Sequence, residues 1–154
     1  MTTIEMGRVK ASVSSPELRS ALVNLNAKAE RAALAAGLER SLLDLIKVRA
    51  SQINKCAYCI GAHTKEARAH GETEQRLALL PAWAETSLYT EQERAALALT
   101  EAITVLTDGF VPDDVYQAAA EVFTEEQLVQ VVWAATIINT FNRLGVSGRM
   151  QPTS

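Results

Sequence analysis

Both cysteines of the chain, Cys56 and Cys59, lie within residues 51–69 together with His63, one of its two histidines. On a helix, where each residue advances by about 100°, these three side chains fall within roughly 60° of one another and form one stripe. Two thiols one turn apart can reach disulfide geometry, with α-carbons about 5 to 6 Å apart. Free N–H groups and the positive dipole end at the start of a helix favour a thiolate there, and Lys55 adds a cation. The stretch is therefore equipped for thiol redox chemistry.

A thiolate beside a second thiol supports a defined cycle. One sulfur attacks an oxidant and becomes a sulfenic acid, the other condenses with it to a disulfide, and an external dithiol restores the pair. His63, one turn beyond Cys59, can accept the thiol proton or supply one to the leaving group, which is typically worth about 100- to 10,000-fold in rate. Asp44 precedes Cys56 by twelve residues. It can orient His63 only if the chain folds back near residues 54–55.

The same residues have other interpretations. Cysteines also pack as inert apolar side chains. The C-x2-C-x3-H spacing offers three zinc ligands, but no fourth Cys or suitably paired second His accompanies them. His70 shares the face of His63, and we expect it to be a surface residue near the helix end. Asp44 could instead be an acid paired with Lys47 or Arg40.

The elements that position these residues are expected to be helices. Pro16 follows a cap residue and precedes an acid, which is a helix start signal, and Gly37 stands where that helix should end. The helix expected over residues 39–53 is apolar over more than a narrow stripe, so it should be central or lie at a subunit contact. The cysteine helix should end near Gly71, and a short helix should follow over 72–81.

Two capping boxes mark the later helices. Thr90 with Glu93 begins a helix to about residue 107, a short helix follows over 112–123, and Thr124 with Gln127 leads into an apolar helix over 128–144. Gly145 is expected to end that helix. With no strand-like alternation, repeat, linker or βαβ pattern, the sequence predicts one all-α domain of about six or seven helices over residues 1–154, and a thioredoxin fold is disfavoured.

Composition excludes several functions. The chain of 154 residues has 48% hydrophobic and 21% charged residues, as in an ordinary globular protein, and its formal charge of −3 provides no basic field for nucleic acid or an anionic membrane. No run approaches the roughly 18 to 20 apolar residues of a membrane span. The N-terminus lacks the apolar core of a secretory signal, so we expect a cytoplasmic protein, in which a CxxC indicates redox or metal chemistry.

Three segments carry a family resemblance: LLDLIKVRASQINKCAYCIGAHTKEARAHGETEQRLALLPAW, TEQERAALALTEAITVL and TIINTFNRLGV. Together they resemble the alkylhydroperoxidase D-like branch of the carboxymuconolactone decarboxylase family over roughly residues 39–146, with a further helix at about 16–36 ahead of this core. The joint occurrence of SQIN, CxxCxxxH and LLPAW is far more specific than a CxxC alone. The decarboxylase branch generally lacks the dithiol, which disfavours lactone decarboxylation here.

The resemblance implies an all-helical subunit that assembles into trimers or hexamers, with the dithiol near subunit contacts. It implies that Cys59 is the peroxidatic cysteine, that Cys56 is the resolving one, and that His63 is the family histidine. Asp44 stands where the family relay has a glutamate. Aspartate is one methylene shorter, and a displacement of about 1 Å can cost on the order of 100-fold in rate. Either the backbone compensates for the shorter side chain, a water bridges the gap, or peroxidase turnover is weak.

We therefore expect a cytoplasmic, oligomeric dithiol peroxidase that reduces hydrogen peroxide or organic hydroperoxides in an antioxidant role. Cys59 attacks, Cys56 resolves, His63 moves the proton, and Asp44 orients His63 directly or through water. No metal, haem, flavin or nucleotide is needed, because sulfur carries the electrons. The partners are the peroxide, an external dithiol reductant and further copies of the chain. The alternatives are a CxxC disulfide reductase or redox sensor without peroxide specificity, and a non-catalytic oligomeric scaffold.

Overall fold

The computed structural model describes residues 7–154, and all regular structure in that range is helical. The all-α class expected from the sequence is confirmed, and a single turn precedes the seven expected helices. The elements are α1 (Ala11–Ser14), α2 (Pro16–Ala35), α3 (Arg40–Ile53), α4 (Ala57–Ala69), α5 (Glu74–Leu79), the 3-10 helix η2 (Leu80–Glu85), α6 (Glu91–Thr104), α7 (Asp113–Val122) and α8 (Glu125–Ser147).

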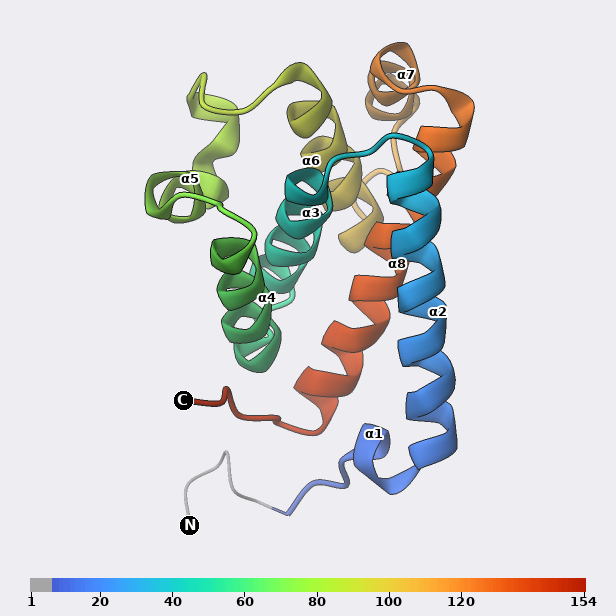
Figure 1. Ribbon diagram of the computed structural model, residues 1–154, viewed down its shortest axis with the longest axis vertical. Helices are drawn as coiled ribbons and strands as arrows, with labels where there is room; N and C mark the ends of the chain where they lie inside the picture. The colour runs from blue at the N-terminus through green and yellow to red at the C-terminus, as the bar shows by residue number, and fades with distance from the viewer. Residues whose placement is uncertain (1–6) are drawn as a thin grey trace.

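Helix α3 lies at the centre of the molecule and packs against α4, α6 and α8 (Figure 1). Leu43, Leu45, Ile46 and Val48 are almost completely shielded from solvent although they point in several directions around the helix. A helix that is apolar on several sides requires neighbours on several sides. The expectation that this helix is central is confirmed.

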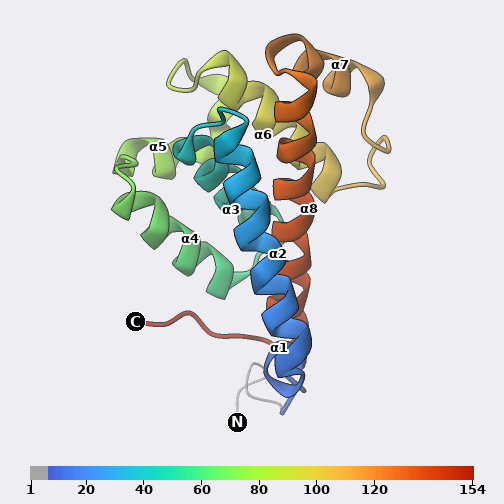
Figure 2. The same cartoon turned by 45° about the vertical axis from the view of Figure 1, so that its right-hand side comes forward.

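Helices α2 and α8 run side by side, and α1 lies near the C-terminal end of α8 (Figures 1 and 2). Both capping boxes are present, Thr90 with Glu93 at the start of α6 and Thr124 with Gln127 at the start of α8. Gly37 has a φ of 90° directly after α2, as expected for a residue that ends a helix in the left-handed conformation.

The expected end of the last helix was wrong. Helix α8 continues through Gly145 to Ser147, and Gly145 is buried inside it rather than following it. Its φ is not in the left-handed region that a helix-ending glycine adopts, whereas that of Gly37 is. Gly145 therefore serves packing, not helix termination.

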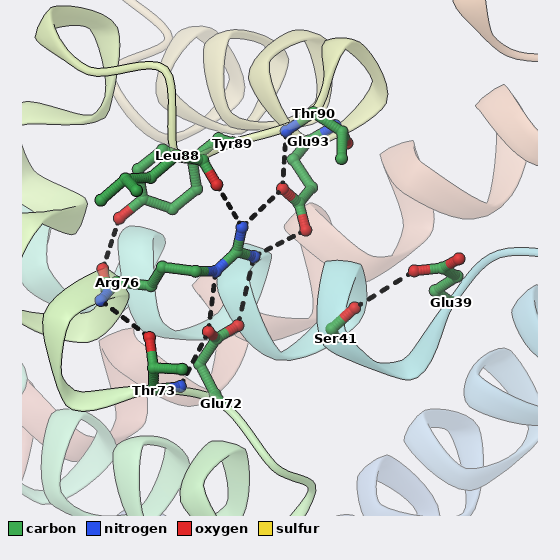
Figure 3. Close-up of polar contacts among 9 residues, drawn as sticks. All are labelled: Glu39, Ser41, Glu72, Thr73, Arg76, Leu88, Tyr89, Thr90 and Glu93. Carbon is green, nitrogen blue, oxygen red and sulfur yellow. Dashed lines mark hydrogen bonds and ion pairs between the residues drawn. The ribbon is translucent and has the colours of Figure 1, made fainter.

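Arg76 of α5 forms hydrogen bonds with Leu88, which follows η2, and with Glu93 in the first turn of α6 (Figure 3). Its guanidinium group donates hydrogen bonds to the carboxylates of Glu72 and Glu93, at 2.8 and 2.7 Å, and stands over the ring of Tyr89. All three partners are largely buried. Such a paired, bidentate arrangement fixes the return of the chain from α4 to α6.

Candidate functional site

The chain reverses direction between α3 and α4 within three residues, as the sequence analysis required. Helix α3 ends at Ile53, Asn54 keeps a helical conformation, and Lys55 turns into the left-handed region with a φ of 53°. Cys56 is then extended and is the N-cap residue of α4. This reversal lays α4 back along α3, so residues early in α3 lie beside residues late in α4.

A buried network of amide side chains holds this turn against α8. The Asn54 amide donates to the side-chain oxygens of Asn139 and Asn142, both at 2.9 Å. Asn142 in turn donates to Ser51 Oγ at 2.9 Å, and the Cys56 N–H donates to the Ser51 carbonyl at 3.1 Å. The network explains why the SQIN stretch and the late INTFN stretch accompany the cysteine pair. Satisfied buried polar networks of this kind specify one packing arrangement.

Cys56 and Cys59 form a disulfide, with their α-carbons 5.2 Å apart. The disulfide geometry expected from the CxxC spacing is confirmed. Both residues are buried, at 2% and 4% exposure. Cys56 Sγ accepts a hydrogen bond from the Cys59 backbone N–H at 3.3 Å. The free N–H groups at the start of α4 therefore stabilise negative charge on the sulfur of Cys56 rather than on that of Cys59.

Gly145 of α8 lies directly over the disulfide. A β-carbon at this position would stand 2.7 Å from Cys56 Sγ and 3.4 Å from Cys59 Sγ. Only glycine leaves room for the sulfur atoms at this approach of α8 to α4. This role of Gly145 was not predicted from the sequence, because the approach joins residues that are almost ninety positions apart.

A cavity of about 520 Å³ borders Cys59 but does not reach Cys56. Its walls come from α1, α2, α4 and α8, and Lys47 of α3 contributes to them. Most of its lining is apolar, and α2 and α8 contribute several of the apolar side chains: Leu18, Leu22, Val23, Ile138, Phe141 and Leu144. The second sulfur of the CxxC is therefore the one that faces a space large enough for a ligand.

His63 lines the same cavity as Cys59, and its partner is Glu66. His63 Nδ1 lies 2.9 Å from Glu66 Oε2, one helical turn further along α4. With Glu66 ionised, Nδ1 carries the proton and donates it, which leaves Nε2 as the basic nitrogen. Glu66 was not predicted as a site residue from the sequence, although its i,i+3 spacing from His63 was a usable signal.

Asp44 was expected to orient His63 directly or through water, and this is wrong, because Asp44 pairs with His70 and His63 pairs with Glu66. Asp44 is buried at 1% exposure and accepts a hydrogen bond from His70 Nδ1 at 2.7 Å. Because α3 and α4 are antiparallel, Asp44 lies level with the end of α4, and His63 lies about 10 Å from His70 along the helix axis. His70 is exposed near the helix end, as expected, but it also covers a buried carboxylate.

The charges around Asp44 follow from this arrangement. Lys47 and Arg40, the alternative partners suggested by the sequence, both form ion pairs with Glu30 of α2 instead. Burial raises the pKa of Asp44 above its usual range, against the hydrogen bond and charge of His70 and the charges of Lys47 and Arg40. The Asp44–His70 pair thus joins α3 to the end of α4 that is distant from the disulfide.

Within residues 7–154, no group of three or more His, Cys, Asp or Glu side chains is arranged to hold a metal ion. In the same range, no helix is both long enough and apolar enough to cross a membrane.

Known proteins resemble this chain in sequence and in structure. The model of the carboxymuconolactone decarboxylase family matches residues 16–102. The uncharacterized protein YdfG of Bacillus subtilis (strain 168) is 44% identical over 110 residues, which cover 71% of this chain and 75% of that protein. A crystal structure of a protein of unknown function from Agrobacterium tumefaciens, assigned provisionally to antioxidant defence as AhpD, has a TM-score of 0.86 and 38% identity, covering 96% of this chain and 98% of that chain.

Proposed function

This chain belongs to the carboxymuconolactone decarboxylase family, and from that premise we propose that it is a dithiol peroxidase that reduces hydrogen peroxide or organic hydroperoxides. The observation that carries the proposal is the asymmetry of the disulfide. Cys59 faces a cavity that it shares with a histidine, whereas Cys56 lies outside the cavity lining and under α8. A sulfur that meets the substrate and a second that is shielded from it have the roles of peroxidatic and resolving cysteine.

The reaction starts from the reduced protein. The Cys59 thiolate attacks the terminal oxygen of the hydroperoxide, the O–O bond breaks, and the alkoxide leaves as an alcohol after taking a proton. Cys59 is thereby oxidised to a sulfenic acid while the peroxide is reduced by two electrons. The Cys56 thiol then condenses with the sulfenic acid, which releases water and forms the disulfide. An external dithiol reduces the disulfide by exchange and is itself oxidised.

His63 and Glu66 handle the protons in this scheme. Nε2 of His63 takes the proton from the Cys59 thiol and returns it to the departing oxygen. Glu66 acts as a positioning residue, because its carboxylate holds Nδ1 in the protonated form and keeps the ring in one orientation. Both residues lie on α4 with Cys59, at spacings that place them on one face.

The test compares peroxide consumption with a dithiol reductant in wild type, Cys59→Ser and Cys56→Ser. Turnover should be lost in both variants. A reagent that traps sulfenic acids should label Cys59 in Cys56→Ser, and Cys59→Ser should remain unlabelled. Equal slow turnover in all three proteins would overturn the proposal.

A second candidate is a disulfide reductase, and the N-cap position of Cys56 favours it. The Cys59 N–H that donates to Cys56 Sγ would stabilise a Cys56 thiolate, which is the nucleophile that such an enzyme requires. Burial at 2% exposure opposes attack by Cys56 on a bulky disulfide. Comparing the oxidation rate of the reduced protein by peroxide with that by a small model disulfide separates the two functions.

A further inference from the structure

The cavity beside Cys59 is much larger than hydrogen peroxide requires. Its volume of about 520 Å³ is typical of sites that enclose small organic ligands, which span roughly 300 to 1,000 Å³. Most of the side chains that α2 and α8 contribute to its lining are apolar. A ligand that fills it therefore has an apolar body, which is removed from water when it binds.

One edge of the cavity is polar and carries a positive charge. Ser15 and Arg19 both line the cavity and lie four residues apart at the start of α2, where i,i+4 side chains are neighbours. Ser15 is the N-cap residue of α2, but its hydroxyl makes no capping hydrogen bond. That hydroxyl is therefore available to a ligand together with the guanidinium group of Arg19.

Arg19 differs from the other charged groups that line the cavity. Lys47 is paired with Glu30, and Glu66 is paired with His63. Among the described residues, Arg19 forms no ion pair with an acid, and it is exposed. The charge distribution thus favours an anionic group at Arg19 and disfavours one beside Glu66.

We propose that the cavity binds an anionic amphipathic hydroperoxide, such as the hydroperoxide of a carboxylic acid with a hydrocarbon body. Its carboxylate accepts hydrogen bonds from Arg19 and Ser15, and its hydrocarbon part lies against the apolar side chains of α2 and α8. Its hydroperoxyl group then meets Cys59 on α4. The proposal rests on the proposed peroxidase function and assigns its substrate class.

The reaction at Cys59 is unchanged by this assignment. The O–O bond breaks, the terminal oxygen passes to the Cys59 sulfur, and the corresponding hydroxy acid leaves with its carboxylate intact. Arg19 takes no part in bond breaking. It is a specificity-determining residue, because a planar guanidinium group pairs with a carboxylate through two hydrogen bonds.

A binding experiment tests the site without any turnover. Decanoate and decanol are titrated calorimetrically into the disulfide form of wild type, Arg19→Gln and Arg31→Gln. Arg31 is a matched control, since it is exposed on α2 and does not line the cavity. We expect decanoate to bind wild type and Arg31→Gln about tenfold or more tightly than decanol, and Arg19→Gln to lose this preference.

A kinetic experiment links the site to the reaction. The kcat/KM for linoleic acid hydroperoxide should fall about tenfold in Arg19→Gln, while that for its methyl ester, which carries no negative charge, should fall by a smaller factor. Equal decanoate affinity in wild type and Arg19→Gln, or no binding of either ligand, would overturn the assignment. Selective decanoate binding in a protein that reduces neither hydroperoxide would overturn the peroxidase function and leave the anion site established.

Discussion

Gly145 and Cys56 approach each other so closely that a β-carbon at residue 145 would stand 2.7 Å from the Cys56 sulfur. Real β-carbons essentially never make such a contact, so a side chain here has to displace either the disulfide or α8. The contact couples the last helix of the chain to the reactive pair. It also keeps Cys56 covered while Cys59 faces the cavity.

Gly145→Ala should therefore destabilise the disulfide form. Overpacking of a buried contact typically costs about 1 to 3 kcal/mol, from which the better helix propensity of alanine subtracts up to about 1 kcal/mol. Denaturant unfolding of the oxidised protein measures the change. Gly61→Ala in α4 is the matched control, because its β-carbon would meet Pro152 Cβ at an ordinary 3.4 Å. Equal effects of the two substitutions would contradict the steric explanation.

Glu66→Gln should slow the peroxide reaction about tenfold, because the glutamine can present its amide to Nδ1 and favour the wrong tautomer of His63. The rate of Cys59 oxidation is measured in single and double variants. If Glu66 acts through His63, then Glu66→Gln should have almost no further effect in the His63→Gln background. Asp44→Asn should change this rate less, since its carboxylate contacts His70. Additive effects of Glu66→Gln and His63→Gln would argue against the relay.

Asn54→Ala should lower the free energy of unfolding by about 2 to 3 kcal/mol. The substitution removes two hydrogen bonds of 2.9 Å and leaves the buried Asn142 oxygen without that donor. Gln52→Ala, at the end of the same helix, should cost less, because its oxygen accepts one hydrogen bond of 3.3 Å from Arg49. Chemical denaturation of both variants provides the comparison. An unchanged free energy of unfolding in Asn54→Ala would show that the network does not stabilise the turn.

The ion pairs of Glu30 should make stability sensitive to acid. Burial alone acts to raise the pKa of Glu30, but the hydrogen bond and charge of Lys47 and the charge of Arg40 outweigh it and lower the pKa. The folded protein thus binds this proton more weakly than the unfolded chain. The stabilisation is fully present above the ordinary glutamate value of 4.5 and is lost as the pH falls below it.

Glu30→Gln should accordingly lower the free energy of unfolding by about 1 kcal/mol at neutral pH. The difference in this free energy between the variant and wild type should become smaller as the pH falls below 4.5. Unfolding measured between pH 3 and pH 7, for both proteins, tests the sign. Glu17→Gln on the same helix is the control, because Glu17 is exposed. A constant difference between Glu30→Gln and wild type over this range would exclude the linkage.

Local signals in the sequence determined most of the helices and the placement of Cys59 and His63 one turn apart on α4. The capping boxes at Thr90 and Thr124 and the helix end at Gly37 were predicted correctly, since they depend on residues within one turn of each other. The same applies to the disulfide, because Cys56 is the N-cap residue of α4 and Cys59 lies in the first turn of that helix. The turn that reverses α3 into α4 was also predicted from local sequence.

Tertiary packing decided which distant residues meet. The register between α3 and α4 places Asp44 beside His70 rather than beside His63. No local pattern in the sequence encodes the register between two antiparallel helices. The cavity forms where α2, α4 and α8 come together, although these helices are far apart in sequence. Gly145 was wrongly predicted to end a helix, because the Cys56 sulfur that it contacts is distant in sequence. The proximity of Cys56, Cys59 and His63 was predicted from their spacing, whereas their surroundings depend on contacts that only the folded chain creates.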